Sequence, residues 1–74
     1  MHFNVYGKTV CPNCKKAVDL LESKGYSYTY TNLEEDINKF FELKSKGVRQ
    51  VPYITVDNEE IGSYNDLVKY LNDI

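Results

Sequence analysis

The chain has 74 residues, of which 42% are hydrophobic and 27% are charged, and its formal net charge is −2. A chain of this size buries only about 60% of the surface that it exposes when unfolded, so we expect one small domain over residues 1–74 with a thin core. No apolar run is long enough for a transmembrane helix or for the ~7–15-residue core of a secretory signal peptide.

Charge and cysteine content exclude two further classes. Nine basic and eleven acidic side chains leave no basic excess, so we expect no nucleic-acid partner. Two cysteines are far below the ~8–10% typical of a disulfide scaffold. Without a signal peptide the expected location is a reducing cytoplasm, where a close cysteine pair is more often catalytic or metal-binding than structural.

The first half of the chain predicts a strand, a helix and a strand. Residues 2–6 form a short strand, and residues 26–31, which alternate Tyr with Ser or Thr, form another. The helix between them begins at residue 11, because Pro12 suits the first helical position, and it ends at Gly25. Apolar residues recur along it at helical spacing and define its inner face: Cys14, Ala17, Val18 and Leu21.

A second helix is predicted in the middle of the chain. Asn32 and Glu35 have the spacing of a capping box, which marks a helix start. The helix then runs to about Lys46, and Gly47 ends it. Its apolar residues are expected to face inward: Ile37, Phe40 and Phe41.

The chain closes with a hairpin and a helix. Residues 53–56 and 59–61 are predicted strands joined by an Asp57-Asn58 turn. Ser63 and Asp66 cap the last helix. The element order β-α-β-α-β-β-α favours parallel pairing across the helices and antiparallel pairing in the hairpin. We therefore expect an α/β fold with a four-stranded mixed sheet flanked by helices.

Cys11 and Cys14 form a Cys-x-x-Cys pair that follows a strand and begins a helix, a position that indicates thioredoxin-like redox chemistry. The unpaired N–H groups and the dipole of a helix start stabilise a thiolate at Cys11, and Lys8 adds a positive charge. The thiolate is the species that attacks disulfides. We therefore expect Cys11 to be the nucleophile and Cys14, one turn further and facing the core, to be the resolving cysteine.

Two other interpretations of the pair come from the same residues. The cysteines could form half of a zinc site, or they could be buried and inert. A closed zinc site needs four ligands, and the chain offers only His2 and carboxylates beyond the pair, so we expect no metal. An exposed loop-to-helix junction also disfavours two inert cysteines.

Taken together, the motifs resemble those of the glutaredoxins. The matching residues are Tyr6-Gly7-Lys8-x-x-Cys11-Pro12-x-Cys14, Val51-Pro52 and Ile61-Gly62-x-x-x-Asp66-Leu67, in the family's order and spacing. The resemblance covers essentially the whole chain and implies the thioredoxin fold. It also implies a monomeric enzyme that reduces protein disulfides and glutathione mixed disulfides, with glutathione as co-substrate and ribonucleotide reductase as a partner protein.

The resemblance implies site residues as well. A cis Pro52 would face the cysteines and complete a catalytic group with Cys11, Cys14 and Lys8. The Val51 backbone would pair with the cysteine part of glutathione, while Lys8 would meet its glycine carboxylate. Arg49 precedes the Val51-Pro52 segment and could help to bind a carboxylate, because an arginine suits bidentate pairing with that group. The expected glutathione contacts are Lys8, Asn13, Arg49, Val51, Pro52, Gly62, Ser63 and Asp66.

Two positions depart from the family pattern. Many glutaredoxins have Tyr where Asn13 stands, and a second Gly where Ser63 stands. A second glycine lets a ligand approach the backbone closely. Ser63 either narrows that approach or replaces it with a hydroxyl hydrogen bond, and the sequence leaves both alternatives open.

Two alternative functions follow from related proteins. NrdH-type redoxins resemble glutaredoxins but take electrons from thioredoxin reductase, and their Ser-Gly-Phe-Arg-Pro-Asp marker is matched here only by Gly62 and Asp66. A dimer holding an iron–sulfur cluster through Cys11 of each chain and glutathione is the other alternative. Glutaredoxins specialised for that role carry Cys-Gly-Phe-Ser, whereas this chain has Cys14 in place of the Ser.

Overall fold

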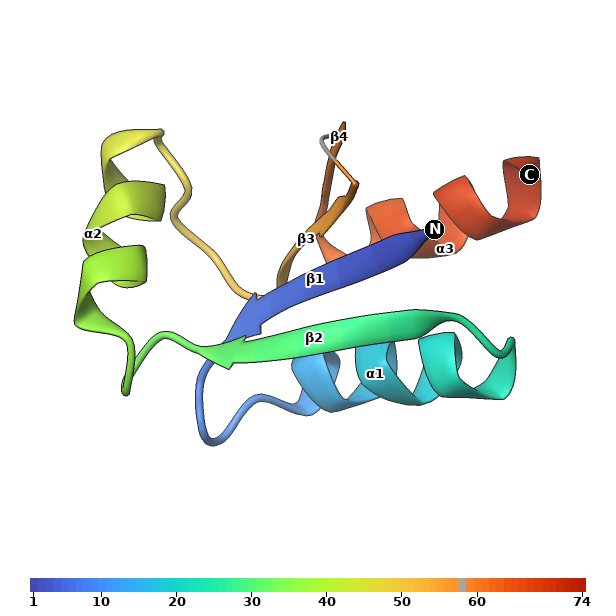
Figure 1. Ribbon diagram of the computed structural model, residues 1–74, viewed down its shortest axis with the longest axis horizontal. Helices are drawn as coiled ribbons and strands as arrows, with labels where there is room; N and C mark the ends of the chain where they lie inside the picture. The colour runs from blue at the N-terminus through green and yellow to red at the C-terminus, as the bar shows by residue number, and fades with distance from the viewer. Residues whose placement is uncertain (58) are drawn as a thin grey trace.

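Strands and helices follow one another along the chain in the predicted order (Figure 1). The computed structural model describes residues 1–57 and 59–74, so the Asn58 half of the predicted turn lies outside the described residues. The elements are β1 (His2–Gly7), α1 (Pro12–Ser23), β2 (Ser27–Asn32), α2 (Ile37–Ser45), β3 (Tyr53–Val56), β4 (Glu59–Gly62) and α3 (Tyr64–Asp73).

The strands form one mixed sheet in the order β2-β1-β3-β4. β1 pairs with β2 in parallel, which the crossover through α1 makes possible. β1 pairs with β3 and β3 with β4 in antiparallel fashion. The predicted four-stranded mixed sheet is confirmed.

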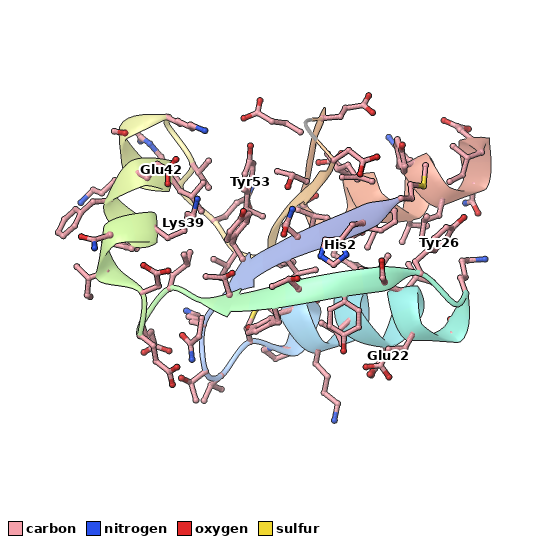
Figure 2. All side chains as sticks on the ribbon, viewed as in Figure 1. His2, Glu22, Tyr26, Lys39, Glu42 and Tyr53 are labelled. Atoms are coloured by element: carbon pink, nitrogen blue, oxygen red, sulfur yellow. A yellow bond between two sulfur atoms is a disulfide. The ribbon has the colours of Figure 1, made fainter. Side chains whose placement is uncertain are left out.

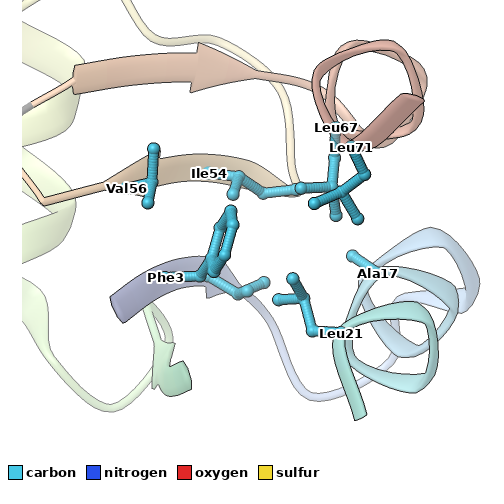
Figure 3. Packing of buried hydrophobic residues seen from close by; sticks show 8 residues of the cluster. Phe3, Ala17, Leu21, Ile54, Val56, Leu67 and Leu71 are labelled. Atoms are coloured by element: carbon cyan, nitrogen blue, oxygen red, sulfur yellow. The ribbon is translucent and has the colours of Figure 1, made fainter. Parts of the chain in front are cut away.

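The main core lies between the sheet and the two helices α1 and α3. The register places Phe3 opposite Val56 and Val5 opposite Ile54, so these side chains share one face of the sheet. Figure 3 shows the side chains of this face meeting those of the two helices. Burial of this apolar surface stabilises the fold. The helical members are Ala17 and Leu21 of α1 and Leu67 and Leu71 of α3.

The start of α2 differs from the prediction. The helix begins at Ile37, and its N-cap is Asp36, whose Oδ1 accepts a hydrogen bond from the Lys39 N–H at 3.0 Å. Asn32 instead ends β2, and its side-chain oxygen accepts a hydrogen bond from the Glu34 N–H at 2.9 Å. The predicted capping box at Asn32 is wrong, because Asn also forms such local turns outside helices.

The apolar residues of α2 do not face inward, so that prediction is wrong as well. Ile37, Phe40 and Phe41 are 52%, 40% and 59% exposed, and the buried residue of the helix is Leu43. Figure 1 gives the reason: α2 stands at one end of the sheet and not over one of its faces. Helical periodicity identifies an apolar side but does not say where the helix stands.

α2 reaches the sheet through a charged side chain. The Lys39 ammonium lies 5.6 Å from the centroid of the Tyr6 ring, and its Nζ pairs with a Glu42 carboxylate oxygen at 2.8 Å (Figure 2). Both groups of the ion pair are partly exposed, so its contribution to stability is small. Within residues 1–57 and 59–74, no helix is long and apolar enough to cross a membrane.

Candidate functional site

The cysteine pair begins α1. Cys11 is the N-cap, with an extended backbone, and Pro12 occupies the first turn. A disulfide joins Cys11 to Cys14, whose Cα atoms are 5.2 Å apart. Cys14 is 1% exposed and Cys11 is partly exposed. Solvent therefore reaches Cys11, while Cys14 lies behind it.

The helix start also donates a hydrogen bond to the outer sulfur. The Cys14 N–H points to Cys11 Sγ at 3.2 Å, as a side-chain cap of the helix. It is one of the N–H groups that lack a partner within a helix. A negative charge on Cys11 Sγ would be stabilised by this N–H and by the positive end of the helix dipole.

Gly7 leaves space for the inner sulfur. A Cβ added to Gly7 would collide with Cys14 Sγ and would lie 2.5 Å from the Tyr30 hydroxyl oxygen. Gly7 is the last residue of β1, so the strand backbone itself forms one wall around Cys14. The glycine of the Tyr6-Gly7-Lys8 motif is required here by close approach.

Three side chains from the end of β2 and just beyond it hold the loop that leads to Cys11. The Tyr30 hydroxyl donates to the Lys8 carbonyl at 2.8 Å. The Asn32 side-chain amide donates to Thr9 Oγ1 at 2.9 Å, and the Thr9 N–H donates to Glu34 Oε1 at 2.7 Å. The sequence assigns none of these residues to the site: Tyr30 belongs to the alternating strand pattern of residues 26–31, Asn32 to a predicted helix cap, and Glu34 to no motif.

Pro52 lies at the same end of the sheet as this loop. The Val51–Pro52 peptide is cis, as the resemblance implied, and Pro52 is buried. Tyr53 pairs with Tyr6 in the antiparallel register, so the residue before Tyr53 reaches the sheet end at which β1 leads into the cysteine loop.

An open groove of about 560 Å³ separates the segment after α2 from the start of α3. One wall is basic, with Lys46 and Arg49, and the α3 side is acidic, with Glu60 and Asp66. The groove brings together several predicted glutathione contacts: Arg49, Pro52, Gly62, Ser63 and Asp66.

Two further grooves contain the predicted contacts Lys8 and Val51. One of about 740 Å³ is lined by Lys8, Arg49 and Val51 together with apolar residues of α2, and a smaller one contains Lys8 and Cys11. Lys8 lines both of these two grooves, and in the smaller one it lies beside Cys11. Asn13 is exposed in the first turn of α1, outside these three grooves.

The start of α3 is a complete capping box, as predicted. Asp66 Oδ2 accepts hydrogen bonds from the Ser63 N–H and the Ser63 hydroxyl, both at 3.0 Å. Ser63 Oγ accepts one from the Asp66 N–H at 3.4 Å. The hydrogen bonds from the Ser63 backbone and then its side chain hold the pKa of Asp66 below its usual value.

The Asp66 carboxylate also lies close to Gly62 and leaves no room for a side chain there. Its φ is +114°, a conformation that favours glycine, and a Cβ there would lie 2.5 Å from Asp66 Oδ2. Beside it, the Tyr53 hydroxyl donates to Glu60 Oε1 at 2.5 Å. Burial and then this hydrogen bond raise the pKa of Tyr53 to about 12, so the phenol stays neutral at physiological pH.

Among the described residues, no group of three or more His, Cys, Asp or Glu side chains could hold a metal ion.

The sheet order, a Cys-x-x-Cys pair at the start of the first helix and a cis proline at the same sheet end define a thioredoxin-like thiol–disulfide oxidoreductase. The chain belongs to the glutaredoxin family, because the family model described as Glutaredoxin matches residues 4–61. Glutaredoxin 3 of Escherichia coli is 38% identical over 64 residues, which cover 85% of this chain and 77% of that protein.

Solved structures share the fold of this chain. The glutaredoxin-like protein NrdH-redoxin from Escherichia coli matches with a TM-score of 0.84 at 18% identity, over 96% of this chain and 95% of that one. A buckwheat glutaredoxin in complex with glutathione matches with a TM-score of 0.81 at 24% identity, over 96% of this chain and 68% of that one. Both likenesses confirm the predicted thioredoxin fold.

Proposed function

We propose that this protein is a glutathione-dependent oxidoreductase that reduces protein disulfides and glutathione mixed disulfides through Cys11 and Cys14. The observation that carries the proposal is the placement of a partly exposed Cys11 at a helix start directly in front of a buried Cys14. Glutaredoxin 3 of Escherichia coli, at 38% identity, supports the choice of this activity.

The reaction begins from the reduced pair. The Cys11 thiolate attacks one sulfur of the substrate disulfide, that S–S bond breaks, and the leaving thiolate takes up a proton. The Cys14 thiolate then attacks Cys11 Sγ, which releases the second substrate thiol and forms the Cys11–Cys14 disulfide of this structure. One glutathione opens that disulfide, and a second removes the first as glutathione disulfide. A substrate that is itself glutathionylated needs only Cys11 and glutathione.

The start of α1 and the loop before it stabilise the thiolate of the nucleophile Cys11. The Cys14 N–H, 3.2 Å from Cys11 Sγ, and the helix dipole favour the thiolate over the thiol. Lys8 lines a groove with Cys11 and adds a positive charge. Pro52, at the same sheet end, would shape the approach of the substrate to Cys11.

The grooves offer complementary groups for each part of glutathione. The Val51 backbone would pair with its cysteine residue, and Lys8 and Arg49, which line one groove together, would meet its glycine carboxylate. Gly62, Ser63 and Asp66 would hold the γ-glutamyl end, and Asn13 would lie at the rim beside the cysteines. The buckwheat glutaredoxin complex with glutathione supports this assignment for the family. A cytoplasmic monomer that serves ribonucleotide reductase is the physiological setting that the family suggests.

The test is a coupled assay with hydroxyethyl disulfide, glutathione, glutathione reductase and NADPH. We expect turnover by the wild type, loss of turnover in Cys11→Ser, and retained turnover in Cys14→Ser, because glutathione can resolve the mixed disulfide at Cys11. A wild type that is inert with glutathione but active with thioredoxin reductase would replace the proposal with an NrdH-type function. Retained turnover in Cys11→Ser would contradict the assignment of the nucleophile.

A further inference from the structure

The two outer strands of the sheet protect their free edges differently. A free strand edge offers unpaired N–H and C=O groups to any other extended chain, and proteins protect such edges with short strands, charged side chains or bulges. β4 has all three features: it is four residues long, it contains Glu59 and Glu60, and its pairing with β3 shifts register between Ile54 and Thr55. The β4 edge is therefore a poor partner for another strand.

β2, at the opposite side of the sheet, lacks these protections along its described residues. Its six residues, Ser27–Asn32, pair with β1 in an unbroken parallel register and include no charged residue and no proline. The Leu33 N–H donates to the Gly7 carbonyl and continues that ladder, so by alternation the backbone groups of Tyr28 and Tyr30 point away from β1. Among the described residues, no backbone hydrogen bond from elsewhere in the chain reaches those outward groups.

This free edge leads to the reactive cysteine. The loop that carries Cys11 lies at the arrowhead end of β2 (Figure 1), and a groove of about 340 Å³ is lined by Tyr30, Asn32 and Cys11 together. The charged side chains that line this groove are Lys8 and Lys15. A strand added beside β2 would therefore arrive at Cys11 in the presence of two positive charges.

We propose that the outer edge of β2 docks the substrate protein: an extended, largely uncharged segment pairs with β2 as a fifth strand and presents a disulfide-bonded cysteine to Cys11. The proposal rests on the proposed function and deepens it, because it states how a protein disulfide is recognised. The N–H and C=O groups of an extended segment match those of a strand edge residue by residue. Lys8 and Lys15 favour a carboxylate side chain beside the substrate cysteine.

The direction of the docked segment follows from the direction of β2. Antiparallel pairs are somewhat more stable than parallel ones, and β2 runs toward Cys11. An antiparallel partner therefore runs away from Cys11, so the paired segment follows the cysteine in the substrate sequence. The six residues of β2 span about 20 Å, a length that only a polypeptide can follow. A small disulfide reaches Cys11 without using this edge.

The test traps a peptide on the Cys14→Ser variant. The probe is a peptide of Glu and Cys followed by six alternating Val and Thr residues, with its cysteine in a mixed disulfide with thionitrobenzoate. The Cys11 thiolate attacks the peptide sulfur, that S–S bond breaks, and the thionitrobenzoate thiolate leaves and is measured by its absorbance. The peptide stays on Cys11 because Cys14 is absent, and the readout is the second-order rate constant.

Two N-methylated forms of the peptide are matched controls for each other. One carries N-methyl groups on its Val residues and the other on its Thr residues, so each form loses the N–H groups of one edge of the strand. We expect one form to react about five-fold more slowly than the unmodified peptide, the size of one lost hydrogen bond, and the other to react at a nearly unchanged rate. Equal rates for the two forms would overturn the proposal.

The carboxylate is tested by replacing the Glu of the peptide by Gln. We expect the reaction to slow about two- to three-fold at low salt and the difference to shrink at high salt, because the charges at Lys8 and Lys15 are exposed. An unchanged rate at low salt would contradict the charge complementarity at Cys11.

Thr31→Glu gives β2 the kind of charge that protects β4. Thr31 pairs with Tyr6 and Thr55 of β3 pairs with Asn4, so both threonines lie on the face of the sheet opposite the main core. Thr55→Glu is the matched control, because it adds the same charge to the same face two strands away from the edge. We expect Thr31→Glu to slow peptide trapping about five-fold and Thr55→Glu to have a much smaller effect, with hydroxyethyl disulfide turnover unchanged in both. Equal slowing in the two variants would overturn the proposal.

Amide hydrogen exchange followed by NMR locates the peptide in the trapped complex. The outward N–H groups of Tyr28 and Tyr30 should become protected. Protection at Val51 in their place would overturn the proposal, because the peptide would then lie beside Pro52. Protection at Tyr28 that grows with the concentration of the free protein would also overturn it, since a second copy of the chain would then cover the edge.

Failure of this inference is distinguishable from failure of the proposed function. A wild type that is inert with hydroxyethyl disulfide and glutathione would refute the proposed function. A wild type active in that assay, with equal rates for the two N-methylated peptides, would overturn the docking role of β2 alone. Thermal unfolding verifies that each variant is folded, and the peptide pair decides the question if Thr31→Glu is not.

Discussion

Tyr30 links the sheet to the loop that carries the reactive cysteine. Its hydroxyl donates to the Lys8 carbonyl, and its ring end lies against Gly7, which in turn borders Cys14 Sγ. Burial raises the pKa of Tyr30, so it remains a neutral donor at physiological pH. The hydrogen bond described for its hydroxyl goes to the loop backbone and not to a cysteine, and we regard Tyr30 as a positioning residue for the loop between β1 and α1.

Replacing Tyr30 by Phe removes this donor and keeps the ring. We expect the loss of about 0.5–1.5 kcal/mol of stability and a two- to five-fold slower alkylation of Cys11 by iodoacetamide, because the loop is less well fixed. The rate is measured across pH, since a displaced helix start also shifts the pH at which the thiolate forms. Tyr28→Phe is the control, because among the described residues its hydroxyl bonds only to the exposed Glu22. Identical alkylation profiles in the two variants would contradict the positioning role.

At the scale of whole elements, the caps show where local sequence suffices. Ser63 and Asp66 lie three residues apart and form the predicted box, because every group involved belongs to one turn. Asn32 and Glu35 have the same spacing, yet Asn32 ends β2 and turns toward Glu34. That outcome depends on the pairing of β2 with β1, which short-range patterns do not contain.

The candidate site likewise contains residues that local sequence identifies and residues that only the tertiary structure brings together. The cysteine pair could be located from a strand, a loop and a proline, all adjacent in sequence. The residues that hold its loop come from about 20 residues further along the chain and meet it only through the parallel pairing of β1 with β2. The exposure of the apolar residues of α2 could not be predicted, because the pattern of one helix does not say which of its sides a neighbouring element covers.

The capping box predicts an acid-dependent stability of α3. Its hydrogen bonds lower the folded pKa of Asp66 below the ordinary value of 3.8, so the stabilisation is fully present above that pH and is lost as the pH falls through the folded pKa. Asp66→Asn should therefore unfold at a lower temperature than the wild type at pH 7, and the difference should shrink at pH 3.

Thermal unfolding followed by circular dichroism measures this difference at both pH values. Asp73→Asn, at the other end of α3, is the control and should not reproduce the effect, because Asp73 takes no part in the capping box. If the gap between Asp66→Asn and the wild type is equally large at pH 3, the carboxylate charge does not stabilise the box.

At the scale of the whole molecule, the fold has two unequal parts. The core joins β1, β3, α1 and α3, and its described members include no residue of α2 (Figure 3). Leu43 of α2 and Leu33 of the preceding loop are buried at 5% and 8% exposure and line a groove together, apart from that core. α2 and the grooves that it borders therefore depend on a small separate cluster, whereas the cysteine helix is anchored in the main core.

This division predicts different responses to two matched substitutions. Leu21→Ala removes a fully buried side chain from the main core and should cost about 2–5 kcal/mol, a large part of the ~5–15 kcal/mol of a typical domain. Leu43→Ala should cost less and should act locally, because α2 can open while the sheet, α1 and α3 stay folded. Hydrogen exchange read by mass spectrometry separates the two: Leu21→Ala should accelerate exchange throughout, whereas Leu43→Ala should accelerate it in α2 and spare β1 and α1.

Cys11 would then keep its reactivity in Leu43→Ala, while the groove lined by Lys8, Arg49 and Val51 loses its shape. The KM for glutathione should therefore rise without a matching fall in the alkylation rate of Cys11. Uniform acceleration of exchange in Leu43→Ala would mean that α2 unfolds together with the rest of the chain, and the two-part description would fail.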